Sequence, residues 1–453
     1  MLNKSRASAR CVHPVAVPWI GVFTILALSL SGTSRASAYT PTINGLYALG
    51  SAMHPEIPAA ALANPAVDGI ALRFFWDQLE PSEGAFDWAP MDRAIGSARA
   101  HGKKVSFSVT PGVHTPAWVY GAGAAPFTYL WNRPFGFAQC SEQRIPIPWD
   151  RVYLAKWSTF VRAMGRRYGS NPAVAMVKIT GINSGAAEIN LPHTGGMGAV
   201  NCPGGNNDDA NWRRVGYSRA KIKAAFQASG DVFAESFPHQ AIAAGITPIG
   251  FPLLDNEGSN GGGGQGGGGF GQGGGQGGGG YGQGGGGGFG QGGGFGQGGG
   301  GGGGMFGQRR FGQGGGFGGG GQGGGGRGRG DMGLAQELMA DGASRYGDRF
   351  VLMTGGLSAA MAWTPRGELA GRVKFGDQML LGVTNDRQCR MNRGMTPCDA
   401  HQVFQAAVNR GIESGAAFLE IYIEDIQNPR LQDVLQQAHA RLAPGNSRPV
   451  PGL

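Results

Sequence analysis

A glutamate that is expected to face the interior of the fold is the first residue of this sequence that could carry chemistry. In the apolar run Ala417–Ile423 and the residue after it, strand alternation places Glu420, Tyr422 and Glu424 on one face and the aliphatic residues on the other. The aliphatic face should pack on helices, so Glu420 points inward, where an ionised carboxylate needs a partner or a function. Arg73, which is also expected to face inward, could be that partner. Glu420 is therefore predicted to be either a site residue or half of a structural ion pair with Arg73.

Aromatic residues recur at the ends of strand-like runs and in the segments that follow them. The tryptophans in such places are Trp76, Trp118, Trp131, Trp149 and Trp363. Flat aromatic faces suit the C–H faces of sugar rings, and together these residues favour a carbohydrate cleft over other ligand sites. Histidines in similar segments, His54, His114 and His193, lack the close spacing of metal ligands. We therefore expect neither a metal nor a cofactor.

The elements that position these residues alternate between strand-like and helix-like stretches, which predicts parallel βαβ units. The strand-like stretches are Thr42–Leu49, Gly69–Phe75, Lys104–Val109, Ala175–Thr180, Gln240–Ile246, Phe350–Thr354, Gln378–Thr384 and Ala417–Ile423. Helices are expected after several of them, for example Met91–His101 before Gly102, and a helix capped by Asp150. Eight repeats predict the α/β class and a (β/α)8 TIM barrel, with its site at the C-terminal ends of the strands. An open doubly wound sheet is the alternative, but no Gly-rich phosphate loop follows the first strand.

A motif after the second strand-like run carries a resemblance to a known family. From Trp76 to Trp88 the sequence reads W-x-x-x-E-P-x-x-G-x-F-x-W, and Met91-Asp92 and His101–Val105 follow it. This pattern resembles the clan A glycoside hydrolases, most closely the beta-galactosidase-like proteins of family 42. It covers roughly residues 43–120 and agrees with the barrel predicted from the alternation of elements.

The resemblance implies a retaining glycosidase with two carboxylates about 5 Å apart, a general acid/base and a nucleophile. The clan carries its acid/base in an Asn-Glu pair at the end of strand four. Here Asn183 is followed by Ser184, and Glu188, the first carboxylate after this strand, is predicted to take that role. The clan's nucleophile is a Glu at the end of strand seven, but the predicted strand runs into Asn385-Asp386.

In its place Glu420 is predicted to be the nucleophile or a stabilising carboxylate. The residues expected to bind the substrate are Arg73, Trp76, Asn183, Trp118 and Tyr422. The resemblance thus predicts hydrolysis of O-glycosidic bonds in an oligo- or polysaccharide. The departures from the clan pattern leave a second interpretation, a non-catalytic carbohydrate-binding or surface protein on a degenerate barrel.

Glycine is concentrated in one low-complexity block. Of the 70 residues from Gly261 to Gly330, 49 are Gly, so the segment 258–330 is predicted to be a disordered insertion in the loop after strand five. An adhesive or RNA-binding tract is one interpretation, and repeat expansion in a permissive loop is the other. The formal net charge is +9, of which the block's arginines and the basic residues before residue 39 supply eight charges. The remaining chain is nearly neutral, and no nucleic-acid partner is expected.

The N-terminus has the features of an export signal. Lys4, Arg6 and Arg10 precede the apolar stretch Val15–Leu30, and Ala36-Ser37-Ala38 offers a cleavage site after Ala38. The segment 1–38 is therefore predicted to direct export to the periplasm or the outside, with residues 39–453 as the barrel. An uncleaved membrane anchor is the alternative.

Four cysteines remain after the predicted signal, an even number that indicates disulfides in an exported protein. They are Cys140, Cys202, Cys389 and Cys398. Of the three possible pairings we favour Cys140–Cys202 with Cys389–Cys398. Free thiols and a metal site are the alternatives, and the absence of a C-x-x-C pair argues against the metal.

Overall fold

The computed structural model describes residues 43–51, 55–132, 137–194, 202–203, 207–254, 330–359, 369, 371–379, 381–384 and 399–444. Several sequence predictions lie outside these ranges. They are the export signal, His54, Trp363, Asn385, Asp386, the Cys389–Cys398 pair and most of the Gly-rich block. No helix within the described ranges is both long enough and apolar enough to cross a membrane.

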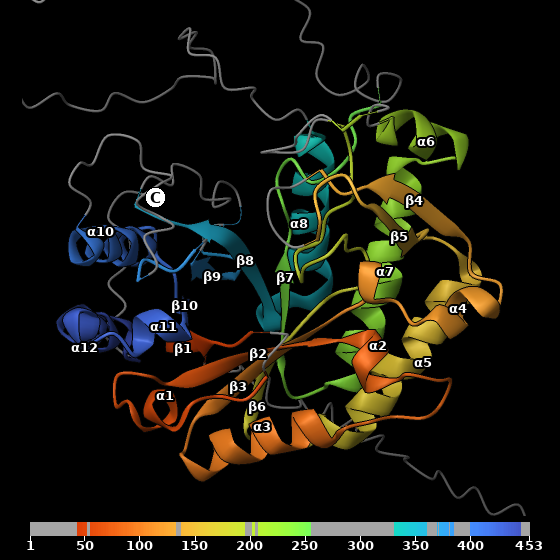
Figure 1. Cartoon of the computed structure of the whole chain (residues 1–453). Helices are drawn as coiled ribbons and strands as arrows, with labels where there is room; N and C mark the ends of the chain where they lie inside the picture. The colour runs from red at the N-terminus through yellow and green to blue at the C-terminus, as the bar shows by residue number, and fades with distance from the viewer. Residues whose placement is uncertain are drawn as a thin grey trace, which may run out of the picture. The chain divides into compact units, whose positions relative to one another are not determined.

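Eight parallel strands close into a barrel in the order β1-β10-β9-β8-β7-β6-β3-β2 (Figure 1). They are β1 (Gly45–Leu49), β2 (Gly69–Phe75), β3 (Lys104–Thr110), β6 (Val174–Lys178), β7 (Ala241–Gly245), β8 (Phe350–Leu357), β9 (Lys374–Met379) and β10 (Phe418–Tyr422). Strand β10 closes the barrel on β1, with Glu420 opposite Tyr47 in the register. The predicted TIM barrel is confirmed, and the open-sheet alternative is excluded.

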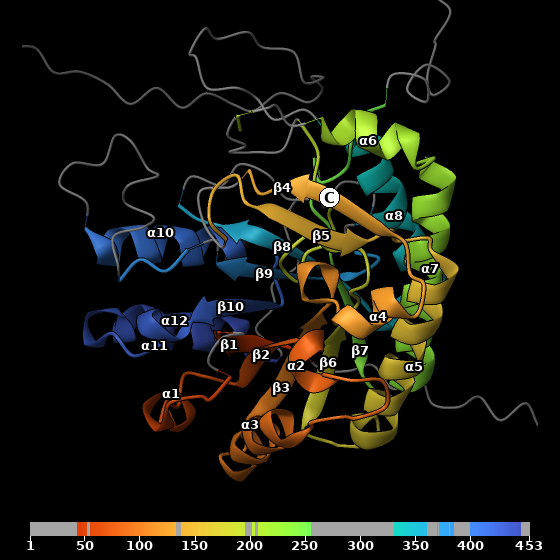
Figure 2. The same ribbon diagram turned by 45° about the vertical axis from the view of Figure 1, so that its right-hand side comes forward.

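Helices surround the barrel, as both ribbon views show (Figure 2). They are α1 (Ala59–Ala63), α2 (Trp76–Leu79), α3 (Ala89–Ala100), α4 (Ala117–Gly121), α5 (Arg151–Tyr168), α6 (Asp208–Arg214), α7 (Arg219–Ser236), α8 (Met332–Tyr346), α10 (Ala400–Glu413), α11 (Ile423–Ile426) and α12 (Gln432–Leu442). Short 3₁₀ turns occur at Gly112–His114, Gly347–Arg349 and Pro429–Leu431. Asp150 caps α5 as predicted, because its side chain accepts a 2.9 Å hydrogen bond from the Tyr153 amide.

The core has two parts, and strand alternation decides which side chains enter each. One part lies between the sheet and the helices and includes Leu72, Phe107 and Ile421. The other fills the barrel interior and includes Met176 and Phe418. The barrel interior is therefore packed toward the N-terminal ends of the strands, and an opening is expected only at their C-terminal ends.

The largest boundary difference concerns the seventh barrel strand, β9, which ends at Met379 rather than at Thr384. Its first residues include Gly376 and Asp377, both of low strand propensity, whereas the apolar run after Gln378 looks more strand-like. Gly376 belongs in the strand because a Cβ there would lie 2.1 Å from the Phe418 ring inside the barrel. The residue that faces the mouth at the end of this strand is Gln378.

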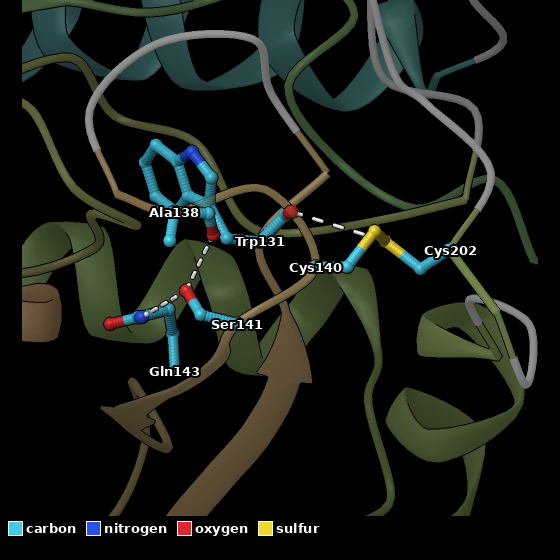
Figure 3. The surroundings of a disulfide bond; sticks show 6 residues. All are labelled: Trp131, Ala138, Cys140, Ser141, Gln143 and Cys202. Carbon is cyan, nitrogen blue, oxygen red and sulfur yellow. Dashed lines mark hydrogen bonds between the residues drawn. A yellow bond between two sulfur atoms is a disulfide. The ribbon is translucent and has the colours of Figure 1, made fainter.

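An antiparallel hairpin, which the sequence did not predict, lies in the connection after β3. Strands β4 (Pro126–Leu130) and β5 (Glu142–Pro146) pair along their whole length. The predicted disulfide Cys140–Cys202, with a Cα–Cα distance of 5.4 Å, links the hairpin's loop to the segment before α6 (Figure 3). The disulfide thus joins two connections that follow neighbouring strands of the barrel.

The chain leaves the described region at Leu254 after β7 and returns at Gly330 before α8. The two flanks are held together: the Asp331 amide donates a 3.0 Å hydrogen bond to the Phe251 carbonyl. A Cβ at Gly330 would lie 2.3 Å from the Ile249 carbonyl, so the backbones touch there. The Gly-rich block is therefore inserted after the fifth barrel strand, at the position predicted.

Candidate active site

The loop that carries Glu188 begins at a glycine, and the amide side chains of Asn183 and Asn190 both donate to the Glu188 carbonyl. Gly181 has φ +124°, and a Cβ there would lie 2.4 Å from the Ser229 hydroxyl, so only glycine fits. Asn183 Oδ1 accepts a hydrogen bond from the Gly181 amide at 2.7 Å, and Asn183 Nδ2 donates to the Glu188 carbonyl at 2.8 Å. Both ends of this amide are used inside the loop. Asn183 therefore positions Glu188, and the sequence prediction that it binds substrate finds no support.

The Glu188 side chain lies over two strand ends that have no side chains of their own. Its Cγ is 3.8 Å from where a Cβ at Gly245 would be, and its Oε1 is 2.9 Å from where a Cβ at Gly355 would be. Gln378 Nε2 donates a 3.4 Å hydrogen bond to the same Oε1. Because Gly245 ends β7 and Gly355 lies near the end of β8, the carboxylate lies at the barrel mouth.

Tyr422 lies at the same mouth, between groups of opposite charge. Burial raises the pKa of its phenol, the Arg73 charge opposes this rise, and the charges of Glu188 and Glu424 add to it. The Arg73 guanidinium carbon lies 5.9 Å from the centre of the Tyr422 ring. Arg73 Nε donates a 2.8 Å hydrogen bond to the Gly50 carbonyl, which fixes its stem. The structure thus brings together Glu188, Arg73 and Tyr422, all three predicted from the sequence.

Glu424 is a second carboxylate at the mouth that the sequence analysis did not select. It lies in the first turn of α11, directly after β10, and its Oε1 is 2.7 Å from where a Cβ at Gly382 would be. The signal for it was present, since the alternation that selects Glu420 and Tyr422 reaches Glu424 next. Its position at the strand end, where barrel sites occur, gave that signal weight.

Glu420 lies deeper in the barrel and has a different partner from the one predicted. Its side chain is fully buried, and Lys178 Nζ donates a 2.7 Å hydrogen bond to Glu420 Oε2. The predicted ion pair with Arg73 is therefore wrong. Lys178 ends β6 and faces the interior because Met176, two residues earlier, does so. A lysine in an otherwise apolar strand was the signal that the sequence analysis passed over.

Two tryptophans predicted to bind substrate belong to the protein's packing. Trp76 is fully buried, and its Nε1 donates to Glu80 Oε2 at 2.8 Å. Trp118 Nε1 donates to the Glu80 carbonyl at 3.0 Å, and the two indole rings meet edge to face. The prediction that Trp76 contacts substrate is wrong, because the side chain is buried. Trp76 and Glu80 of the motif instead stabilise the turn after β2. Burial also raises the pKa of the Glu80 carboxyl, and the hydrogen bonds that it accepts from the Gly84 amide and the Trp76 indole oppose this rise.

Aromatic rings also gather where β2 and the hairpin approach the mouth. Phe75, the last residue of β2, stacks on His114 with ring centres 3.5 Å apart. Phe137 contacts both His114 and Trp131. A Cβ at Gly185, in the Glu188 loop, would lie 2.9 Å from the Trp131 ring. Trp131 therefore packs directly on the loop that carries Glu188.

The disulfide holds Trp131 in this position. The Cys140 amide donates a 2.7 Å hydrogen bond to the Trp131 carbonyl. The same carbonyl oxygen lies 3.9 Å from the Cys202 sulfur of the disulfide, as the dashed line in Figure 3 shows. Ser141 Oγ donates to the Ala138 carbonyl at 2.6 Å and closes the same turn. Within the described ranges, no three His, Cys, Asp or Glu residues are grouped to hold a metal ion.

The match to a known protein family covers the first half of the barrel. Residues 62–183 match the beta-galactosidase family model, glycoside hydrolase family 42. This match confirms the resemblance to clan A that the motif after β2 predicted. The beta-galactosidase-like span runs from α1 through β6 and ends at Asn183, before Glu188 and Glu424. No curated protein sequence matches the chain.

Solved structures that resemble the chain include two beta-galactosidases and an endo-glycoceramidase. The beta-galactosidase from the psychrophilic Marinomonas ef1 shares 15% identity at TM-score 0.29, over 45% of this chain and 37% of its own. The family 42 beta-galactosidase from G. stearothermophilus shares 18% at TM-score 0.31, over 46% and 36%. Endo-glycoceramidase II from Rhodococcus sp. shares 15% at TM-score 0.30, over 46% and 50%. The matched part thus spans half or less of each of these proteins, and none of these likenesses carries an argument about function.

Proposed function

We propose that this protein is a glycoside hydrolase that cleaves O-glycosidic bonds of an oligo- or polysaccharide at the barrel mouth. The observation that carries the proposal is the Glu188 carboxylate, which extends over Gly245 and Gly355 and accepts a hydrogen bond from Gln378. A carboxyl group in such a place can protonate the leaving glycosidic oxygen. The beta-galactosidase family match over residues 62–183 supports a sugar substrate.

A retaining mechanism needs a second carboxylate that attacks the anomeric carbon. Glu420 is a poor candidate, because it is fully buried and bonded to Lys178. Glu424 is partly exposed at the mouth, and its charge acts on Tyr422 together with that of Glu188. We therefore assign the nucleophile to Glu424 and a structural role to Glu420.

In the first step Glu424 forms a bond to the anomeric carbon while Glu188 gives its proton to the departing oxygen. In the second step Glu188 takes a proton from water, and the resulting hydroxide displaces Glu424 and releases the sugar. The raised pKa of Tyr422 keeps its phenol protonated at neutral pH, so it can donate a hydrogen bond to the substrate or to a carboxylate. Arg73 supplies a positive charge beside the Tyr422 ring at the same mouth.

Hydrolysis of o-nitrophenyl β-D-galactopyranoside by the full chain tests the proposal. Glu188→Gln and Glu424→Gln are expected to lower kcat by at least about 10²-fold, a typical loss for an acid–base group. Glu413→Gln, an exposed substitution in α10, is the matched control and should keep the wild-type rate. Wild-type activity in Glu188→Gln contradicts the assignment, and inverted anomeric configuration in the product contradicts the retaining step.

A second candidate function is carbohydrate binding without turnover. The observation that favours it is Gln378 at the mouth end of β9, the seventh barrel strand, where the clan carries its nucleophilic Glu. An amide is not a nucleophile of this kind. Saturable binding of lactose by a chain that hydrolyses no galactoside supports this candidate, and turnover excludes it.

Export is part of the proposal, because the segment 1–38 has the features of a cleaved signal. The measurement is N-terminal sequencing of the protein recovered from the periplasm or the medium. A mature chain that begins at Tyr39 supports export, and an intact Met1 in the recovered protein contradicts cleavage.

A further inference from the structure

A pocket outside the barrel mouth lies between the β4–β5 hairpin and α6, two elements that are neighbours in both ribbon views (Figures 1 and 2). Its volume is about 270 Å³. The polar residues that line it include Glu142 of β5, Asn207 before α6, and Asp208, Asn211 and Arg214 of α6. Leu130 and Tyr129 of β4 supply an apolar side. The volume is close to the lower end of small-molecule sites, which suits a ligand the size of one sugar ring.

One lining residue holds a buried acceptor without a donor. Asp208 is 2% exposed, and its Oδ2 has no hydrogen-bond partner among the described residues. Burial, and then the charge of neighbouring Asp209, raise the pKa of this carboxyl to about 6. Above that pH the group is a buried anion, which is unfavourable until a donor reaches it. A ligand that fills this pocket is therefore expected to present an O–H or N–H to Asp208.

The remaining lining groups decide between classes of ligand. Arg214 donates a 2.8 Å hydrogen bond to Asn211 Oδ1 and has further N–H groups, while the carboxylates of Glu142 and Asp208 accept. An anion would meet the two carboxylates, and a simple cation would meet Arg214. A neutral molecule with a donor and an acceptor on neighbouring atoms can pair with both kinds of group. Adjacent hydroxyls of a sugar have this property.

The wall of the pocket is held rigid by aromatic stacking. Trp212, within α6, lies flat on Phe127 of β4, with ring centres 3.6 Å apart and planes 6° apart. Trp212 Nε1 also donates a 2.7 Å hydrogen bond to the Pro192 carbonyl. The helix that carries Asp208, Asn211 and Arg214 is thereby fixed against the hairpin. A preformed site loses little conformational entropy when a ligand binds.

We propose that this pocket is a second saccharide-binding site, which takes one neutral hexose unit through its hydroxyl groups. Asp208 accepts from one hydroxyl, and Arg214 with the amides of Asn207 and Asn211 serves the neighbouring one. The site uses none of the residues at the barrel mouth, so it does not depend on the proposed hydrolysis.

Calorimetric titration of the full chain with lactose tests this site. We expect Asp208→Asn and Asn211→Ala to weaken binding at one site by at least about tenfold, as loss of a charged hydrogen bond does. Asp348→Asn, an exposed substitution of the same type away from the pocket, is the matched control. Asn211→Ala keeps the test decisive if Asp208→Asn fails to fold, which far-UV circular dichroism reports.

Three outcomes overturn the proposal. They are unchanged lactose binding in both pocket variants, no lactose binding in any variant, and Asp208-dependent binding of methylammonium or Ca²⁺ alone. Failure of the proposed hydrolysis is seen separately, as absence of galactoside turnover in the wild-type chain with the lactose site at Asp208 intact.

Discussion

Replacing Gly355 with alanine tests whether the position of the Glu188 carboxylate matters for catalysis. The new Cβ would lie 2.9 Å from Glu188 Oε1, whereas ordinary contacts of this kind begin at 3.4 Å. The carboxylate oxygen must therefore move by roughly 0.5 Å, because it belongs to the mobile end of a side chain while the strand backbone is fixed. The same movement alters the geometry of the 3.4 Å hydrogen bond that Gln378 Nε2 donates to this oxygen.

The expected effect is large on rate and small on stability. A displacement of about 1 Å in a reacting group can cost about 10²-fold in rate, so half that shift predicts a loss of roughly tenfold, or about 1.4 kcal/mol in the barrier. Alanine in a strand interior is favoured over glycine by about 0.5–1 kcal/mol, which offsets the cost of moving the side chain. The melting temperature is therefore expected to stay near the wild-type value.

The assay is kcat/KM for o-nitrophenyl β-D-galactopyranoside together with a thermal melt. Gly245→Ala is the matched control, because its Cβ would lie an ordinary 3.8 Å from Glu188 Cγ. Wild-type rates are expected for Gly245→Ala and a tenfold loss for Gly355→Ala. The reasoning is refuted if Gly355→Ala keeps the wild-type rate while Glu188→Gln loses it, or if both glycine variants lose activity equally.

Three further predictions concern stability. Lys178→Met leaves Glu420 buried without its partner and should lower the free energy of unfolding in urea by about 3–5 kcal/mol; the double variant Lys178→Met/Glu420→Gln should recover most of this, and no recovery argues against the pair. The pKa of Asp208 in the folded protein, about 6, is above its usual value, so wild-type stability falls as pH rises through 6. Asp208→Asn should therefore stabilise the fold at pH 8 by roughly 1.4 kcal/mol more than at pH 5. An equal effect of the substitution at both pH values in thermal melts contradicts this. The double variant Cys140→Ala/Cys202→Ala opens a link between residues 62 apart in sequence, and chain entropy predicts a loss of up to about 4 kcal/mol, which an unchanged urea midpoint would contradict.

The barrel could be predicted because its signals are local. Alternating apolar runs located all eight strands, and for Gly69–Phe75 the predicted and observed bounds coincide. The seventh strand was displaced because its first residues are selected by a contact from another strand, the Phe418 ring against Gly376. No pattern within residues 374–384 contains that information. The β4–β5 hairpin was missed because it begins at a proline and its second strand carries charged residues, both weak strand signals.

The candidate site was only partly predictable, because its contacts join residues far apart in sequence. Alternation placed Glu420 in the interior, but its partner Lys178 lies 242 residues away in sequence. The sequence analysis named Arg73 as the partner instead. Glu188 was selected by its order after strand four alone. The Glu188 side chain lies over Gly245 and Gly355, and it fits there because these two residues have no side chain. The sequences of their strands do not indicate this contact.

The junction at residues 254 and 330 has a consequence for how this protein can change. The Asp331 amide donates to the Phe251 carbonyl, and Gly330 contacts Ile249. The two flanks are therefore held together by direct contacts with each other, independently of the segment between them. Arg219 Nε also donates a 2.7 Å hydrogen bond to Asp331 Oδ2 and so helps to hold the second flank in place. Each doubling of a connection's length adds only about 0.6 kcal/mol of closure entropy. Residues can therefore be added or removed between positions 254 and 330, by replication slippage or by design, with little effect on the stability of the barrel.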